Sequence, residues 1–206
     1  MTEFSKFKVG LALCCSIVAA GCANKEGPAS VATDSSVAIS CIAVMSVQPS
    51  VDFEDMASPA EKKTLKDGSQ VMDGLLKQFL SGKANVRFAA EEKGAGNSPV
   101  NARQIADRFK CNAVLETSLS RYAERMGGSY GAKEPAAVTF TYRLYETGSG
   151  KVICHGRFDE KQQSVMDNLL TLPKAQNRGM TWLTAEELLR EGLKERLGQC
   201  SYLEGK

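Results

Sequence analysis

The stretch TGSGKV, residues 147–152, is rich in glycine and holds a lysine, as loops that bind nucleotide phosphates do. Phosphate binding by such a loop requires a glycine five residues before Gly150 and a Ser or Thr after Lys151 to hold Mg²⁺. Tyr145 and Val152 occupy those two positions. The stretch therefore predicts a turn between two strands and not a phosphate site.

The single histidine, His155, follows Cys154 in a stretch that is typical of a β-strand. Neighbouring strand residues point to opposite faces of a sheet, so the two are not a nucleophile and its base. One histidine and four cysteines without CxxC spacing do not make a usual zinc site. The acidic pairs Glu91-Glu92, Asp159-Glu160 and Glu186-Glu187 suit solvated loops, strand ends and helix starts. We expect no catalytic residue, metal or cofactor, and no small-molecule substrate.

The composition is typical of one globular domain with a net charge close to zero. The chain has 206 residues, of which 43% are hydrophobic, and 26 Lys and Arg oppose 24 Asp and Glu for a net charge of +2. A domain of this length can bury a sizeable core. A balance so close to neutrality does not predict a basic face, so nucleic acid is not an expected partner.

The first residues form a short apolar segment with a positive start. Lys6 and Lys8 precede the run VGLALCCSIVAA, residues 9–20, and Gly21-Cys22 follow it. Twelve apolar residues are too few to span a bilayer as a helix but suit the core of a signal peptide. The small residues at its end are typical of a processing site.

The stretch SIVAAGCANK, residues 16–25, resembles the bacterial lipobox, in which small residues ending in Gly precede the cysteine that is modified. The resemblance implies a lipoprotein signal peptide over residues 1–21, cleavage before Cys22, diacylglycerol on its sulfur and a third acyl chain on its amine. Ala23, where Asp would imply retention at the inner membrane, implies an anchor on the periplasmic face of the outer membrane. The alternative is a buried helix end in which Cys22 is a free thiol. Residues 23–37 are small and polar and indicate, with Cys22, a lipidated flexible tether.

Four of the seven cysteines remain if Cys14 and Cys15 leave with the signal and Cys22 is lipidated. An even number in an oxidising periplasm allows two disulfides, with three possible connectivities. Buried thiols are the alternative, because cysteine is among the most buried residue types. The four possible disulfide residues are Cys41, Cys111, Cys154 and Cys200.

The segments before residue 110 predict two strands that alternate with two helices. AISCIAVMSV, residues 38–47, is a continuous apolar run typical of a strand buried on both faces. SPAE at 58–61 predicts a helix start with Ser58 as N-cap, and Gly82 is placed to end that helix. VRFAA, residues 86–90, predicts a short strand, and Asn101 an N-cap of the second helix.

The remaining segments predict three strands and a final helix. NAVLETSL, residues 112–119, is the third strand, and 151–158 pairs back on 137–145 through the turn. Thr184 and Glu187 predict the capping box of the last helix. We interpret 127–135 as a polar connection and 165–180 as irregular. The residues expected on the inner face of the strand 137–145 are Val138, Phe140, Tyr142 and Leu144.

These elements predict an α/β fold: a single mixed-sheet sandwich in the order β-α-β-α-β-β-β-α, with helices packed on the sheet. The first strands should be parallel and the last three an antiparallel meander. The domain covers residues 38–200, with 201–206 as a C-terminal tail. Tyrosine is enriched at binding surfaces, although packing on the sheet is an equal alternative. The tyrosines proposed for partner binding are Tyr122, Tyr130, Tyr142 and Tyr145.

CIAVMSVQPSVDF, ARQIADRFKCNAVLETSLSRY and YRLYETGSGKVICHGRF resemble the domain shared by the curli secretion lipoprotein CsgG, the penicillin-binding-protein activator LpoB and the N-terminal domain of TolB. The match covers roughly residues 38–163, and the segment 107–115 carries most of it. The resemblance implies an envelope binding or assembly module without catalytic residues. We expect an envelope protein partner that binds the sheet edge or the tyrosine-bearing strands. The alternatives are an LpoB-like activator of a peptidoglycan synthase, a CsgG-like secretion component and a small cell-wall hydrolase that uses His155 or Glu160.

Overall fold

The computed structural model describes residues 38–50, 58–83, 85–89, 99–163, 170 and 172–203. The predicted signal peptide, Cys22 and the tether lie outside the described residues. Within these ranges, every helix is too short or too polar to cross a membrane.

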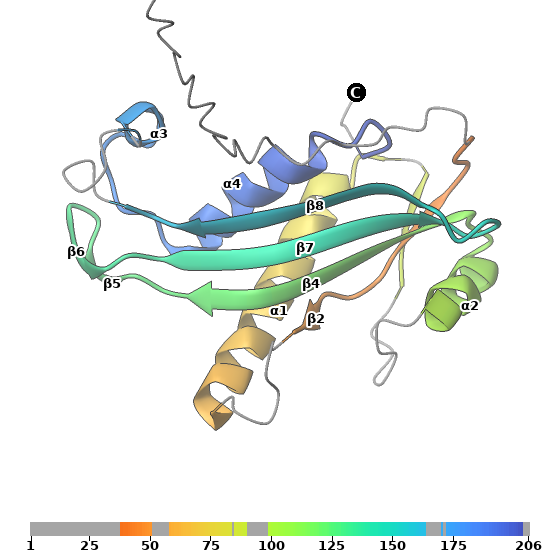
Figure 1. Ribbon diagram of the computed structural model, residues 1–206, viewed down its shortest axis with the longest axis horizontal. Coiled ribbons are helices and arrows are strands. Elements are labelled where there is room, and N and C mark those ends of the chain that lie inside the picture. The colour runs from red at the N-terminus through yellow and green to blue at the C-terminus, as the bar shows by residue number, and fades with distance from the viewer. Residues whose placement is uncertain are drawn as a thin grey trace, which may run out of the picture.

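The fold is a mixed α/β sandwich, as predicted, and three long strands give it its length (Figure 1). The described part of the main sheet has six strands in the order β3-β1-β4-β7-β8, and β2 pairs with β4 beyond the end of β1. β1 is parallel to β3 and β4, whereas β4, β7 and β8 form an antiparallel meander. Both pairings confirm the sequence prediction. The strand bounds are β1 Ile42–Val44, β2 Gln48–Pro49, β3 Val86–Phe88, β4 Ala113–Ala123, β7 Ala137–Glu146 and β8 Val152–Lys161.

The described helices are α1 (Pro59–Leu80), α2 (Pro99–Phe109), α3 (Leu172–Asn177) and α4 (Ala185–Leu197). The capping boxes predicted for the first and last helix are both present. The first helix ends at Leu80 with Ser81 as C-cap, so Gly82 comes one residue after the cap. The second helix begins two residues earlier than the Asn101 cap that the sequence predicted, because proline suits a first helical turn.

The helices cover the sheet unequally (Figure 1). α1 and α4 pack on one face, over a core that β4, β7 and β8 share. α2 packs on the opposite face over β1 and the start of β4, where a disulfide joins Cys41 to Cys111. The inner residues predicted for β7, Val138, Phe140, Tyr142 and Leu144, are all buried in the larger core.

Two segments differ from the sequence prediction. The polar connection contains a hairpin of β5 (Met126–Gly128) and β6 (Gly131–Glu134), and the irregular segment contains α3. Neither segment has an apolar period from which the element could be predicted. Tertiary contacts hold both elements in place instead. The hairpin is a separate two-stranded sheet that lies beyond the ends of β4 and β7, at the end opposite α2 (Figure 1).

Candidate functional site

One of the four tyrosines proposed for partner binding, Tyr142, belongs to the core, which corrects the prediction for it, and Tyr122 packs against that core. Tyr142 is only 2% exposed, and its hydroxyl donates to the carbonyl of Arg196 at 2.9 Å. Its ring lies against Gly156, where any Cβ would come within 2.5 Å of Cε1. The ring of Tyr122 lies in the same way against Gly68 of α1, at 2.5 Å from the position of a Cβ. A glycine leaves room for each ring, so Tyr142 belongs to the core and Tyr122 is partly buried against it.

The other two tyrosines lie far apart along the sheet. Tyr145 is half-buried beside a cavity of about 410 Å³ between α2 and the β7–β8 turn. Tyr130 is 87% exposed at the tip of the β5–β6 hairpin, at the other end of the long strands. The four tyrosines therefore do not form one surface, and Tyr130 alone is fully exposed.

The β7–β8 turn confirms that TGSGKV is a turn. The carboxylate of Glu146 accepts the N–H groups of Gly148 and Ser149, both at 2.6 Å. These hydrogen bonds hold the pKa of Glu146 below its usual range, chiefly through the Ser149 hydroxyl and N–H. A phosphate would need the same N–H donors, and a charged carboxylate already occupies them.

His155 and Glu160 cannot act together as a catalytic pair. Both lie in β8 and are five residues apart, so about 17 Å separates them and they point to opposite faces. His155 is exposed, and Glu160 is engaged by Lys174 and Arg178. Cys154 is buried in a disulfide with Cys200, on the face opposite His155. Among the described residues, no cluster of three His, Cys, Asp or Glu could hold a metal ion.

A second region has the character of a binding surface, and we call it the hairpin end. It comprises the β5–β6 hairpin, Leu170, α3 and the loop of residues 178–184, which leads into α4. Exposed apolar surface is a common mark of a binding site where it extends over neighbouring elements. The hairpin end contains four of the five most exposed large apolar side chains in the described part of the chain: Met126 at 56%, Tyr130 at 87%, Leu170 at 89% and Met180 at 57%.

Hydrogen bonds join the hairpin to the loop before α4. The N–H of Trp182 donates to the carbonyl of Ser129 at 2.7 Å, and its own carbonyl accepts from Arg125 Nη1 at 2.7 Å. The carboxylate of Glu124 accepts the N–H of Ala185, the first residue of α4, at 3.1 Å. An acidic group at a helix N-terminus is stabilised by the exposed N–H groups there. The hairpin therefore has a fixed position on the domain.

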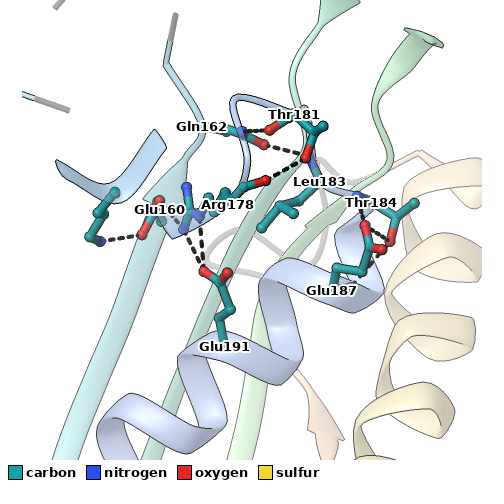
Figure 2. Close-up of polar contacts among 9 residues, drawn as sticks. Glu160, Gln162, Arg178, Thr181, Leu183, Thr184, Glu187 and Glu191 are labelled. Atoms are coloured by element: carbon teal, nitrogen blue, oxygen red, sulfur yellow. Dashed lines mark hydrogen bonds and ion pairs between the residues drawn. The ribbon is translucent and has the colours of Figure 1, made fainter. Parts of the chain in front are cut away.

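A buried guanidinium fixes the other side of the loop (Figure 2). The side chain of Arg178 is 7% exposed and lies between Glu160, at 2.8 Å, and Glu191, at 2.7 Å. Burial raises the pKa of Glu160, but hydrogen bonds and charges from Lys174 and Arg178 outweigh it and hold the pKa below its usual range. Burial likewise lowers the pKa of Arg178, and its two carboxylate partners raise it above the usual value. The network is therefore charged at neutral pH and joins β8, α3 and α4.

Gln162 holds the loop itself (Figure 2). Its Nε2 donates to the carbonyl of Thr181 and its Oε1 accepts from the N–H of Leu183, both at 2.8 Å. The intervening turn has positive φ at Gly179 (67°) and at Met180 (59°). Left-handed backbone is uncommon for a methionine, and these contacts hold Met180 in a conformation that leaves its side chain in solvent.

Sequence reasoning missed most of this surface. Met126, Met180 and Trp182 are isolated apolar residues in polar, glycine-rich segments, so periodicity did not select them. The sequence signal that could have indicated this surface is Gly179-Met180, between an arginine and a tryptophan, because large apolar residues are unusual in a turn.

No known protein-family model matches the chain, and no curated protein sequence matches it either. Solved structures are similar in chain path. PelC from Paraburkholderia phytofirmans, in a structure described as a dodecamer, is 17% identical over 81% of this chain and 89% of PelC, with a TM-score of 0.42. The LpoB C-terminal domain from Escherichia coli is 15% identical over 62% of this chain and 87% of that domain, with a TM-score of 0.34. Lipoprotein GNA1162 from Neisseria meningitidis is 15% identical over 68% and 99%, with a TM-score of 0.37. Likeness of this size concerns the fold alone.

Proposed function

We infer that this protein is a non-catalytic binding module of a bacterial envelope. Cys22 carries the lipid that anchors it to the periplasmic face of the outer membrane, and the hairpin end binds an envelope protein. The observation that supports this assignment is that the hairpin end has several exposed apolar side chains, of which Tyr130 is the main one. Aromatic residues and methionine are enriched in the cores of protein–protein interfaces, and a surface held in position before binding loses less entropy on association.

The place where the chain enters the domain supports this arrangement. Asn112, directly before β4, donates from Nδ2 to the carbonyl of Ala38 at 2.8 Å. The hairpin follows the other end of this strand of 11 residues, which is about 35 Å long. A tether from Cys22 therefore joins the domain at one end of the sheet and leaves the hairpin end available to a partner in the periplasm.

An LpoB-like activator is the version of this function in which the partner is a peptidoglycan synthase. The same hairpin end would then contact the synthase. The described residues contain no observation that favours a CsgG-like secretion role or a hydrolase.

Site-specific photocrosslinking of the full chain in cells tests the proposal. A photoreactive phenylalanine at Tyr130 should give a discrete adduct with an envelope protein, and the same group at the exposed Gln70 of α1 should not. Replacement of Cys22 by alanine should release the protein from the membrane fraction. Equal adducts from positions 130 and 70, or no adduct from either, would remove the support for the hairpin end as an interface.

A further inference from the structure

β8 is a long edge strand. It has ten residues, and among the described residues β7 is the only strand that pairs with it. Alternate N–H and C=O groups of an edge strand point away from the sheet and can pair with another chain. The opposite edge of the sheet, β3, has three residues, so β8 is by far the larger site for an added strand.

A groove runs beside the C-terminal part of this edge, between β8 and α3. It encloses about 550 Å³, and its walls include Lys161, Gln163, Leu170 and Lys174. Because α3 lies next to the end of β8 (Figure 1), a strand that added to β8 would continue into the groove.

The charges along this surface favour an acidic occupant. The groove has four cations, Arg121, Lys161, Lys174 and Arg178, and two carboxylates, Asp159 and Glu160. Both carboxylates already have partners, since Asp159 binds Arg121 and Arg157, and Glu160 binds Lys174 and Arg178.

Lys161 is the cation available for a new partner. It is exposed in β8, and no ion pair involves it within the described residues. The exposed Arg157, four residues earlier, lies on the same face of the strand and pairs with Asp159 between them.

We propose that an extended acidic segment of a partner protein adds to β8 as a further strand and ends in this groove. Backbone hydrogen bonds from the edge provide affinity, and two carboxylates four residues apart, opposite Arg157 and Lys161, provide specificity. This inference goes beyond the proposed function, because it assigns a second surface and the chemistry of its occupant.

Fluorescence anisotropy with the full chain in detergent tests the inference. The probe is a fluorescein-labelled peptide as long as β8, in which Val alternates with Ser except for two Glu placed four residues apart on the Ser face. It should bind saturably, and K161E should weaken binding by about tenfold or more. K66E makes the same charge change at an exposed position of α1 and should leave the affinity within about twofold.

Backbone-modified peptide separates strand addition from charge attraction without changing the protein. Methylation of alternate peptide nitrogens on one edge should weaken binding by about tenfold, and the parent peptide should slow hydrogen exchange of the β8 amides. The inference would be overturned if the methylated peptide, a peptide with Lys in place of Glu, or labelled oligothymidylate bound as tightly as the parent peptide. The absence of binding by the parent peptide would overturn it as well. Because the Tyr130 crosslink does not depend on Lys161, failure here leaves the proposed function separately testable.

Discussion

The middle of the sheet and the hairpin end are held together by different forces. In the middle, Tyr142 and Phe158 lie against glycines at positions 156 and 192, so strands and α4 approach closely over a continuous apolar core. At the hairpin end, a buried guanidinium, Gln162 and backbone hydrogen bonds hold the chain. Polar contacts fix the hairpin end without using the side chains of Met126, Tyr130 and Met180, and this leaves those three side chains exposed.

The largest effect should come from the middle of the sheet. Tyr142→Ala removes a buried ring and its hydrogen bond to Arg196, so the free energy of unfolding should fall by about 3–5 kcal/mol. Tyr130→Ala removes a ring that is 87% exposed and should change it by no more than about 0.5 kcal/mol. Urea unfolding followed by circular dichroism measures both. Similar losses for the two variants would contradict the assignment of one tyrosine to the core and the other to the surface.

A smaller, local effect should follow from removal of the guanidinium at the hairpin end. Arg178→Ala leaves Glu160 and Glu191 without their shared cation, and we expect a loss of about 2–3 kcal/mol. Trp182 is the single tryptophan, and its backbone bonds to the hairpin, so its fluorescence reports this region. Its emission should shift in native buffer while the circular dichroism of the sheet stays unchanged.

Arg190→Ala is the matched control. Arg190 also pairs with a glutamate, Glu186, but both side chains are more than half exposed. Surface pairs contribute about 0–1 kcal/mol, and this one lies outside the loop. An equal shift of the Trp182 emission in both variants would mean that the guanidinium of Arg178 has no special role in the position of the loop.

Much of the fold could be predicted from the sequence because its signals are local. Ser58-Pro59 and Thr184 with Glu187 mark helix starts through side chains within one turn, and both capping boxes are present. The alternation in 137–145 identified the inner face of β7. Parallel pairing of the first strands followed from the alternation of strands and helices.

The site could not be predicted in the same way, because its contacts join residues that are distant in sequence. The Tyr142 ring packs on Gly156 of the neighbouring strand, and the Tyr122 ring packs on Gly68 of α1. The hairpin is stabilised by the contact of Ser129 with Trp182, which are 53 positions apart. Tyrosine content alone cannot distinguish a ring that packs on a glycine from one in solvent.

A still smaller difference should separate the two helix caps. Thr184→Ala and Ser58→Ala each remove a side chain that accepts an N–H in the first helical turn, and each should cost about 1 kcal/mol in urea unfolding. The threonine cap lies two residues after Trp182, whereas the serine cap belongs to α1. Only the Thr184 variant should therefore alter the Trp182 emission in native buffer. A shift in the Ser58 variant would show that this emission does not report the hairpin end alone.

The smallest effect should come from pH, and it should appear first at the hairpin end. The folded-state pKa of Glu160 lies below its usual range, because Lys174 and Arg178 stabilise the carboxylate more than burial opposes it. The stability that this carboxylate contributes is therefore complete above the unfolded pKa of about 4.3 and is lost as pH falls through the lower folded pKa.

The wild type should exceed Glu160→Gln in the free energy of unfolding at neutral pH, and this excess should shrink on acidification below about pH 4.3. The Trp182 emission of the wild type should change in that range before the circular dichroism of the sheet does. The apolar contacts in the middle of the sheet carry no such proton dependence, so a simultaneous change of both signals would mean that the two regions unfold as one unit. A constant difference between wild type and variant down to low pH would instead remove Glu160 from the groups that hold the hairpin end.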